Sequence, residues 1–384
     1  MRKLLLFSGA LILAVLVIYN IWAEMGRAKE QASAVTPVSK TGFNYTEFGA
    51  DSGKGNVIGM QPLLTPANYS TAANFKNTLF LYFDQLKKQN KLTAKSVVVL
   101  PEYIGTWLVA ANEKENIYQQ PTMDAAMTNL VTSNLFKFIA HYYQAPAKDK
   151  MKYALFSMKG KQMAAIYEQV FSQLAKEFNC VIVAGSIALP DAFVNSEGKL
   201  EINSKGKIYN TSVVFGTDGK IIPPLVKKIF PVDDEQVFSG CGKEDQMPIF
   251  KTSAGKMALL ICADSWFPAA YTTVAGKVDF IVIPSLGGVD SVWNAPWNGY
   301  NGFKAPADVD TSQYHKITEG DAWIKYSMGK RAPQSKIHYG MNVFFTGTLW
   351  DLKPEGRVLV LNKDSLTVLA PSINEGRIVN LYLP

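Results

Sequence analysis

Short apolar runs alternate with longer amphipathic segments along most of the chain. The runs at residues 57–60, 96–102 and 180–189 predict buried strands, because strands covered on both faces are apolar throughout. Residues 72–91 and 163–178 instead carry apolar side chains at helical spacing. The alternation of the two patterns predicts an α/β fold in which helices cover sheets.

The same alternation continues to the C-terminal part of the chain. Residues 208–222 predict two strands around a Thr-Asp-Gly turn. Further strands are predicted at residues 257–264, 278–285, 341–352 and 357–371.

Two long segments interrupt this regular pattern. Residues 286–320 are rich in Gly, Pro, Asn and Trp, and residues 104–160 contain an apolar helical stretch at 135–143. Long irregular segments inside a domain are often lids or binding loops. The stretch 135–143 has three interpretations, which are a helix packed on the domain, a lid over a site, and a segment that dips into lipid.

The N-terminal segment predicts a membrane anchor. Leu4 to Trp22 form 19 uncharged residues, which is long enough for a helix to cross a bilayer core of ~30 Å. Arg2 and Lys3 favour a cytoplasmic start. We therefore expect a single-pass anchor at 1–23 with the body of the protein outside the cytoplasm, on the periplasmic or extracellular side. A cleaved signal peptide is the alternative.

The rest of the chain is expected to form one domain. Residues 24–54 are polar and small and are interpreted as a linker, and residues 55–384 as a single folded unit. The formal net charge is +7, but the lysines are scattered, so nucleic-acid binding is not expected.

The three cysteines are Cys180, Cys241 and Cys262. They cannot all pair with one another, and no CxxC motif or Cys/His cluster predicts a metal site. Pairing of Cys180 with Cys241 is not favoured, because Cys180 begins a predicted buried strand.

Three chemically interesting residues follow predicted strands: Glu102, Lys227 and Cys262. Taken singly, each has an ordinary structural explanation. A lone cysteine is often a small core residue, a strand-terminal glutamate is often solvated, and the Lys227-Lys228 pair could be an exposed basic pair. A protease-like triad would need a histidine, and the three histidines lie in stretches without a nucleophile motif.

Taken together, these segments resemble the nitrilase superfamily, the carbon–nitrogen hydrolases. The resemblance is carried by "VVVLPEY", "IYNTSVVFGTDGKIIPPLVKKIFP" and "GKMALLICADSWFP", and it extends from about residue 55 to 384. It implies a four-layer α-β-β-α sandwich. It also implies Glu102 as general base, Lys227 as its electrostatic partner and Cys262 as nucleophile, with Lys228 as an open alternative for the lysine.

The resemblance suggests further site residues. Glu235 is similar to a second glutamate that positions the lysine or substrate in some branches, although it could be an ordinary loop carboxylate. Asp264 could orient the turn at the cysteine by capping backbone N–H groups. Trp107 follows Glu102 closely and either lines the pocket or belongs to the core. Trp293 and the aromatic residues that follow it shape the substrate site, form a small loop core or make an oligomer contact.

The residue types suit a thioester mechanism. A free thiol has a pKa of about 8.5, so a nearby carboxylate must take its proton, and we expect the lysine charge to favour the thiolate. The reaction needs neither a cofactor nor a metal. We therefore predict a membrane-anchored amidase that acts on a small amide or nitrile, with dimerisation as a further expectation. The alternatives are an N-acyltransferase that passes the acyl group to an amine, and a non-catalytic scaffold with the same fold.

Overall fold

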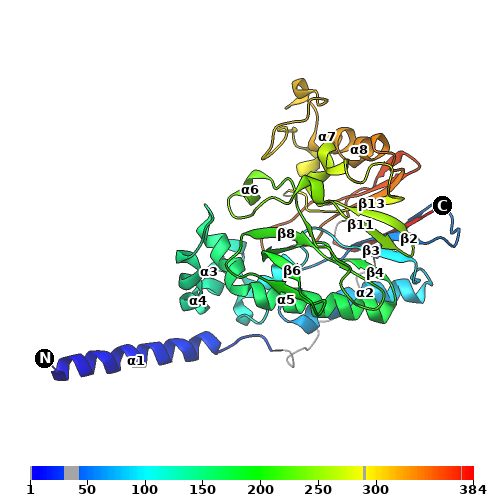
Figure 1. Cartoon of the computed structure of the whole chain (residues 1–384). Helices are drawn as coiled ribbons and strands as arrows, with labels where there is room; N and C mark the ends of the chain where they lie inside the picture. Colours follow the sequence, from blue (N-terminus) through cyan, green and yellow to red (C-terminus); the bar gives the residue numbers. More distant parts are fainter. Residues whose placement is uncertain (1, 30–42, 289–290, 373) are drawn as a thin grey trace.

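Two six-stranded sheets pack face to face and carry helices on their outer faces, as Figure 1 shows for the computed structural model. The structure describes residues 2–29, 43–288, 291–372 and 374–384. Side chains of both sheets form one buried cluster, in which Val57 and Val99 of the first sheet meet Ile281 and Met341 of the second. The predicted four-layer α-β-β-α architecture is confirmed.

The first sheet is mixed and is covered by two long helices. Its strands, in spatial order, are β1 (Phe43–Phe48), β17 (Gly376–Tyr382), β2 (Asn56–Gln61), β3 (Ser96–Val99), β4 (Val181–Val183) and β9 (Val214–Phe215). The helices α2 (Ala72–Lys88) and α5 (Lys150–Phe178) pack on its outer face. Each helix begins at a side-chain cap, in which Thr71 and Asp149 accept a backbone N–H of the first turn.

The second sheet is covered by short helices. Its strands are β11 (Ile249–Thr252), β12 (Gly255–Leu259), β13 (Phe280–Ser285), β14 (Tyr339–Phe344), β15 (Val358–Asn362) and β16 (Ser365–Val368). The helices α7 (Glu319–Tyr326) and α8 (Met328–Gln334) lie on its outer side (Figure 1). The parallel strands β12, β13 and β14 end at the same edge of this sheet, where Cys262 follows β12.

Smaller elements extend from this frame. A three-stranded sheet contains β10 (Val226–Lys227), β8 (Ile208–Ser212) and β5 (Ile187–Pro190), and a hairpin contains β6 (Ala192–Val194) and β7 (Leu200–Ile202). Three helices lie near one end of the sandwich: α3 (Met123–Ser133), α4 (Leu135–Tyr143) and the short α6 (Asp233–Gln236) (Figure 1).

Several predicted elements differ from the observed ones. The segment 180–189 was expected as one strand, but it forms β4 and β5 in different sheets. Gly185 makes the break, with φ at +65° and no room for a side chain against Pro101. The linker expected at 24–54 is also shorter, because β1 pairs with β17 inside the first sheet.

The N-terminal helix α1 (Arg2–Glu24) projects away from the sandwich (Figure 1). Its segment Leu6–Glu24 is long and apolar enough to cross a membrane, and only 6% of it is buried. The chain that follows is attached to the domain, because Arg27 lies 2.8 Å from the buried Glu113, which also binds Lys159 at 2.7 Å. Ala28 N–H donates to the Glu113 carbonyl as well. The end of α1 is therefore docked on the domain.

Candidate active site

An ammonium group lies between two carboxylates in the interior of the domain. Lys228 Nζ is 2.8 Å from Glu102 Oε1 and 2.7 Å from Glu235 Oε2. Asn210 Nδ2 donates to Oε1 of both glutamates, at 2.7 Å and 3.1 Å. These three charged residues are at most 5% exposed, so water screens their attraction only weakly.

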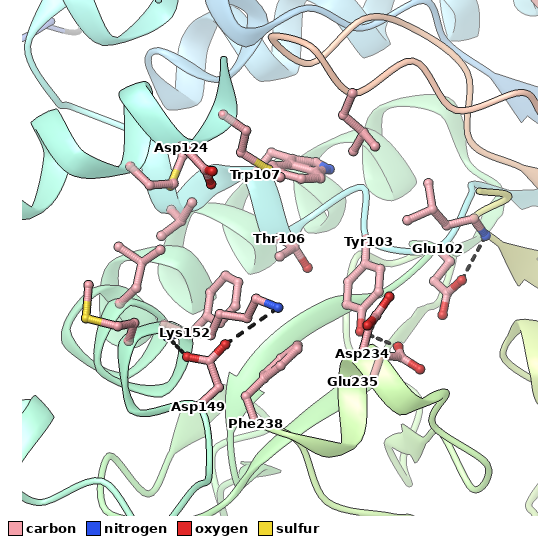
Figure 2. Close-up of a pocket in the computed structure, with 18 of the residues that line it drawn as sticks. Glu102, Tyr103, Thr106, Trp107, Asp124, Asp149, Lys152, Asp234, Glu235 and Phe238 are labelled. Carbon is pink, nitrogen blue, oxygen red and sulfur yellow. Dashed lines mark hydrogen bonds and ion pairs between the residues drawn. The ribbon is translucent and has the colours of Figure 1, made fainter. Parts of the chain in front are cut away.

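Loops at strand ends hold these groups in place. Glu102 follows β3, and its second carboxylate oxygen accepts the backbone N–H of Leu286, just after β13, at 2.8 Å (Figure 2). Glu235 lies on α6 and accepts the Tyr103 hydroxyl and the Val232 N–H. Each carboxylate is therefore fixed at both oxygens.

The thiol of Cys262 completes the group. Cys262 follows β12 and adopts a left-handed backbone with φ of +50°, which is uncommon for a residue with a side chain. Its Sγ lies 3.8 Å from the Leu286 carbonyl and interacts with the Glu102 carboxylate. The strained turn therefore directs the thiol toward the predicted base.

Asp264 joins the cysteine turn to the lysine segment. Its Oδ1 accepts the backbone N–H groups of Ile229 and Phe230 at 2.9 Å and 2.8 Å, and its Oδ2 accepts that of Ile261 at 3.2 Å. Asp264 thus caps backbone N–H groups, as its place in the sequence suggested. It is not among the residues that line the cavity, so its contribution is positional.

The structure corrects the choice of lysine. Lys227, the residue favoured from the sequence, extends away from the glutamates to Asp191 at 2.8 Å and lies over the Tyr209 ring. Neighbouring side chains of an extended strand point to opposite sides, so only one of the two lysines can face Glu102. That residue is Lys228, which is 2% exposed.

The environment separates the pKa values of the two glutamates. Burial raises the pKa of Glu102, and the attraction of Lys228 does not outweigh burial and the repulsion of Glu235. Burial also acts to raise the pKa of Glu235, but Lys228 and the hydrogen bonds from Tyr103 and Val232 lower it overall. Two carboxylates around one ammonium carry a net negative charge, and Glu102 is the one disposed to accept a proton.

The resting thiol is protonated. Burial, followed by the charge of Glu102, raises the pKa of Cys262, and the attraction of Lys228 only partly offsets this. The lysine charge thus lowers the pKa of the thiol in the expected direction, but burial and the charge of Glu102 outweigh it. Proton removal has to accompany attack, which is the task of a general base.

A cavity of about 830 Å³ leads to these groups, with Glu102, Lys228, Glu235 and Cys262 among its lining residues. Figure 2 shows Trp107 and Asp124 on one side of it, and Asp149, Lys152 and Phe238 on another.

Of the two predicted tryptophans, only Trp107 lines the cavity, and among the described residues its buried indole nitrogen has no hydrogen-bond partner. Trp293 packs instead against Trp323 and Phe344. The aromatic residues after it join a loop core, in which Trp297 stacks on Tyr326.

Sequence reasoning missed two members of the network. Tyr103 donates its hydroxyl to Glu235, and Asn210 bridges the two glutamates. Both stand inside segments that carry the family resemblance, "VVVLPEY" and "IYNTS". Their place in these motifs was the available signal, but a strand pattern does not reveal that Asn210 points at a carboxylate 108 residues earlier in the chain.

All three cysteines are free thiols, with Cys180 and Cys262 buried and Cys241 exposed. Within residues 2–29, 43–288, 291–372 and 374–384, no group of three or more His, Cys, Asp or Glu side chains is arranged to hold a metal ion.

Comparisons with known proteins indicate a family for this chain. The family model described as carbon-nitrogen hydrolase matches residues 57–299. The probable hydrolase YhcX of Bacillus subtilis is 34% identical over 111 residues, which are 29% of this chain and 19% of that protein. The omega-amidase NIT3 of Saccharomyces cerevisiae is 34% identical over 122 residues, 30% of this chain and 38% of that protein. The match thus spans well under half the length of either relative.

A solved structure shares the fold. A double mutant of the amidase from Nesterenkonia sp. AN1 in complex with acrylamide superposes with a TM-score of 0.50 and 11% sequence identity. The alignment covers 88% of this chain and 94% of the amidase. At this identity the likeness concerns the architecture.

Neighbouring lysines provide a matched test of the site geometry. We predict that Lys228→Met lowers kcat/KM for an amide substrate by about 10²-fold or more, because it removes a buried donor that faces the reacting groups. Lys227→Met should stay close to the wild-type rate. Because Lys228→Met leaves two buried carboxylates unpaired, thermal melting and the double variant Lys228→Met/Glu235→Gln serve as folding controls. A larger loss from Lys227→Met would contradict the assignment.

The acid limb of the pH profile should report Glu102. The active form is the carboxylate, so kcat/KM falls as the pH drops through its pKa, which lies above the usual 4.5. Glu235→Gln removes a repulsion that raises this pKa, so the limb should move to lower pH. Asp191→Asn, at the other lysine, should leave the limb in place. A limb that stays fixed or moves to higher pH in Glu235→Gln would rule out this coupling.

Proposed function

Because the chain belongs to the carbon–nitrogen hydrolase family, we propose that it is a membrane-anchored amidase that cleaves a non-peptide C–N bond through a thioester on Cys262. One observation carries this proposal. A protonated thiol, a carboxylate of raised pKa and a fixed ammonium group meet at the wall of a cavity large enough for a substrate.

In the first half of the reaction, Cys262 attacks the amide carbon. The Sγ–C bond forms as the thiol proton passes to Glu102, and the carbonyl oxygen takes the negative charge. Lys228 and the backbone N–H of Ala263 are the proposed donors to this oxygen, because preorganised donors stabilise the charge that develops there. The C–N bond then breaks, and the amine leaves with the proton from Glu102.

In the second half, water resolves the thioester. Glu102, again a carboxylate, takes a proton from water as the oxygen attacks the carbonyl carbon. The C–S bond breaks, the acid leaves, and the proton returns to the sulfur. An N-acyltransferase would share every step up to the thioester and would use an amine in place of water. The product therefore identifies the acceptor.

Glu235 is proposed as a positioning residue. It contacts the Lys228 ammonium at 2.7 Å, in addition to Glu102, and stays ionised, as its lowered pKa indicates. Without it, Glu102 and Lys228 would form an isolated pair, and the pKa of Glu102 would fall. Glu235 thereby keeps the base able to accept a proton.

The docking of the chain after α1 supports an anchor that is retained. Arg27 contacts Glu113 and also donates to the Ser133 carbonyl and the Asn134 side chain. Cleavage of the N-terminal segment as a signal peptide, at any position after Arg27, would remove Arg27 and leave buried Glu113 with Lys159 as its remaining ionic partner. We propose a single-pass protein whose catalytic domain lies on the extracytoplasmic side.

The role of Cys262 as nucleophile can be tested with a second cysteine, Cys241, as the control. We predict that Cys262→Ala lowers amide turnover by about 10⁴-fold or more, because no thioester can form. Cys241→Ala, at an exposed thiol, should keep the wild-type rate. Turnover is measured as ammonia and free acid released, and circular dichroism checks the fold. Comparable turnover in Cys262→Ala would remove the proposed mechanism and favour the scaffold alternative.

Whether the N-terminal anchor is retained can be tested by measuring the intact mass of the protein. We predict that the protein extracted from membranes has the intact mass of the chain that includes residues 1–34, because the segment after α1 is part of the folded domain. It should require detergent for extraction, and a protease added to the extracytoplasmic side should reach the domain. A soluble form that begins after residue 24 would show that the segment is a signal peptide.

A further inference from the structure

We infer that the cavity binds an amide with a long aliphatic chain and that this chain enters from the membrane surface. The inference rests on the proposed function and adds a substrate class to it. It follows from the lining of the cavity, the exposure of its outer residues and the contact of its rim with α1.

The cavity is larger and more apolar than a small amide requires. Its volume of about 830 Å³ lies in the upper part of the range of about 300–1,000 Å³ for sites that enclose drug-sized ligands. Apolar side chains from three helices and neighbouring loops supply most of its wall, among them Val109, Met127, Val131, Phe138, Leu155 and Phe238. An apolar wall of this extent favours a hydrocarbon chain over a polar substituent.

The lining changes from buried to exposed along the cavity. Glu102, Cys262 and Leu155 are buried. Thr128 and Met151, which belong to α3 and to the start of α5, are exposed. The chemistry therefore lies among the buried residues. The exposed lining residues of α3, of the first turn of α5 and of α6, where Asp234 is exposed, form the mouth.

The rim of this mouth touches the helix proposed to cross the membrane. The Tyr19 hydroxyl of α1 donates to the carbonyl of Thr132, a lining residue, at 3.0 Å. The same hydroxyl accepts the Leu135 N–H at 2.9 Å, and the Tyr19 ring packs edge-on against Phe136. Figure 1 shows α3 and α4 at the end of the sandwich that faces α1. Tyrosine near the end of a membrane helix marks the interfacial level, so the mouth lies close to the lipid head groups.

The helix α4 presents apolar side chains to the outside at the same place. Leu135, Phe136, Ile139 and Tyr143 are 37%, 51%, 40% and 81% exposed, and we call these four residues the α4 patch. Phe138 of the same helix lines the cavity. An amphipathic element with exposed aromatic and aliphatic side chains is suited to the bilayer interface. The α4 patch would then hold the mouth against the membrane.

Chain length provides the first test. The probes are straight-chain primary amides from acetamide to octanamide, used as monomers with the full-length enzyme in detergent. Each buried methylene should raise kcat/KM by about fourfold until the cavity is filled, so octanamide should exceed acetamide by at least about 100-fold. A second arm uses N-alkylacetamides of the same lengths. An increase of kcat/KM with chain length among the primary amides places the aliphatic chain on the acyl side, and an increase among the N-alkylacetamides places it on the amine side.

Two matched variants assign the effect to the cavity. Val131→Asp places a charge in the apolar wall and should lower the octanamide-to-acetamide ratio of kcat/KM by at least about tenfold. Leu81→Asp makes the same kind of change on the exposed face of α2, outside the cavity, and should keep the wild-type ratio. An unchanged ratio in Val131→Asp would contradict the assigned path of the chain.

The membrane entry is tested with hexadecanamide embedded in phosphatidylcholine nanodiscs that also hold the enzyme. Ile139→Glu should lower turnover of this embedded amide, relative to monomeric octanamide, by about tenfold, because a charge on the α4 patch opposes contact with lipid. Ile324→Glu, on α7, is the control and should keep the wild-type ratio. An unchanged ratio in Ile139→Glu would overturn entry from the membrane.

The outcomes separate this inference from the proposed function. If acetamide is hydrolysed but kcat/KM does not increase with chain length in the primary amides or in the N-alkylacetamides, the aliphatic-chain inference is overturned and the amidase activity stands. Turnover of none of the amides would overturn the proposed function. In that event, isothermal titration of the Cys262→Ala variant with the same amides decides the inference separately, because affinity that increases with chain length supports the apolar cavity and affinity that does not contradicts it.

Discussion

The contact of the Lys228 ammonium with two buried carboxylates is the interaction on which the rest of the site depends. Burying three charges costs solvation free energy, and the cost is offset only when the geometry and the hydrogen bonds are good. Here Asn210, Tyr103 and backbone N–H groups satisfy the carboxylate oxygens. The group still carries one excess negative charge, which raises the pKa of Glu102 and makes it a proton acceptor next to a protonated thiol. The chemistry thus arises from an incomplete charge balance.

The two sheets and the N-terminal segment give this charge group its surroundings. Strand ends of the packed sheets deliver Glu102 and Cys262 to one place, and Asp264 ties the cysteine turn to the backbone after Lys228. On the other side, α3 and α4 form the outer cavity and meet the end of α1. The buried charged groups therefore line one end of an apolar cavity whose outer helices contact α1, the helix proposed to cross the membrane.

The layered fold and the positions of Glu102 and Cys262 could be predicted from the sequence. The predictions that failed did so for physical reasons. Apolar runs identify buried strands, but they do not say that Gly185 divides one run between two sheets. Spacing from a turn selected Lys227, whereas the alternation of side chains along β10 and beyond gives the buried position to Lys228. Strand β1 was missed because a polar exposed edge strand resembles a linker. The pKa of Cys262 depends on burial and on two distant charges, which no local pattern contains.

We propose that Cys262 carries the acyl group during turnover. Rapid quenching of the full-length enzyme with a primary amide in excess, followed by intact-mass and peptide analysis, measures this directly. We expect a hydroxylamine-sensitive mass increase equal to the acyl group, located on the peptide that contains Cys262 and absent from Cys262→Ala. Release of acid from the amide without an adduct on that peptide, or with an adduct on Cys241 instead, would contradict it.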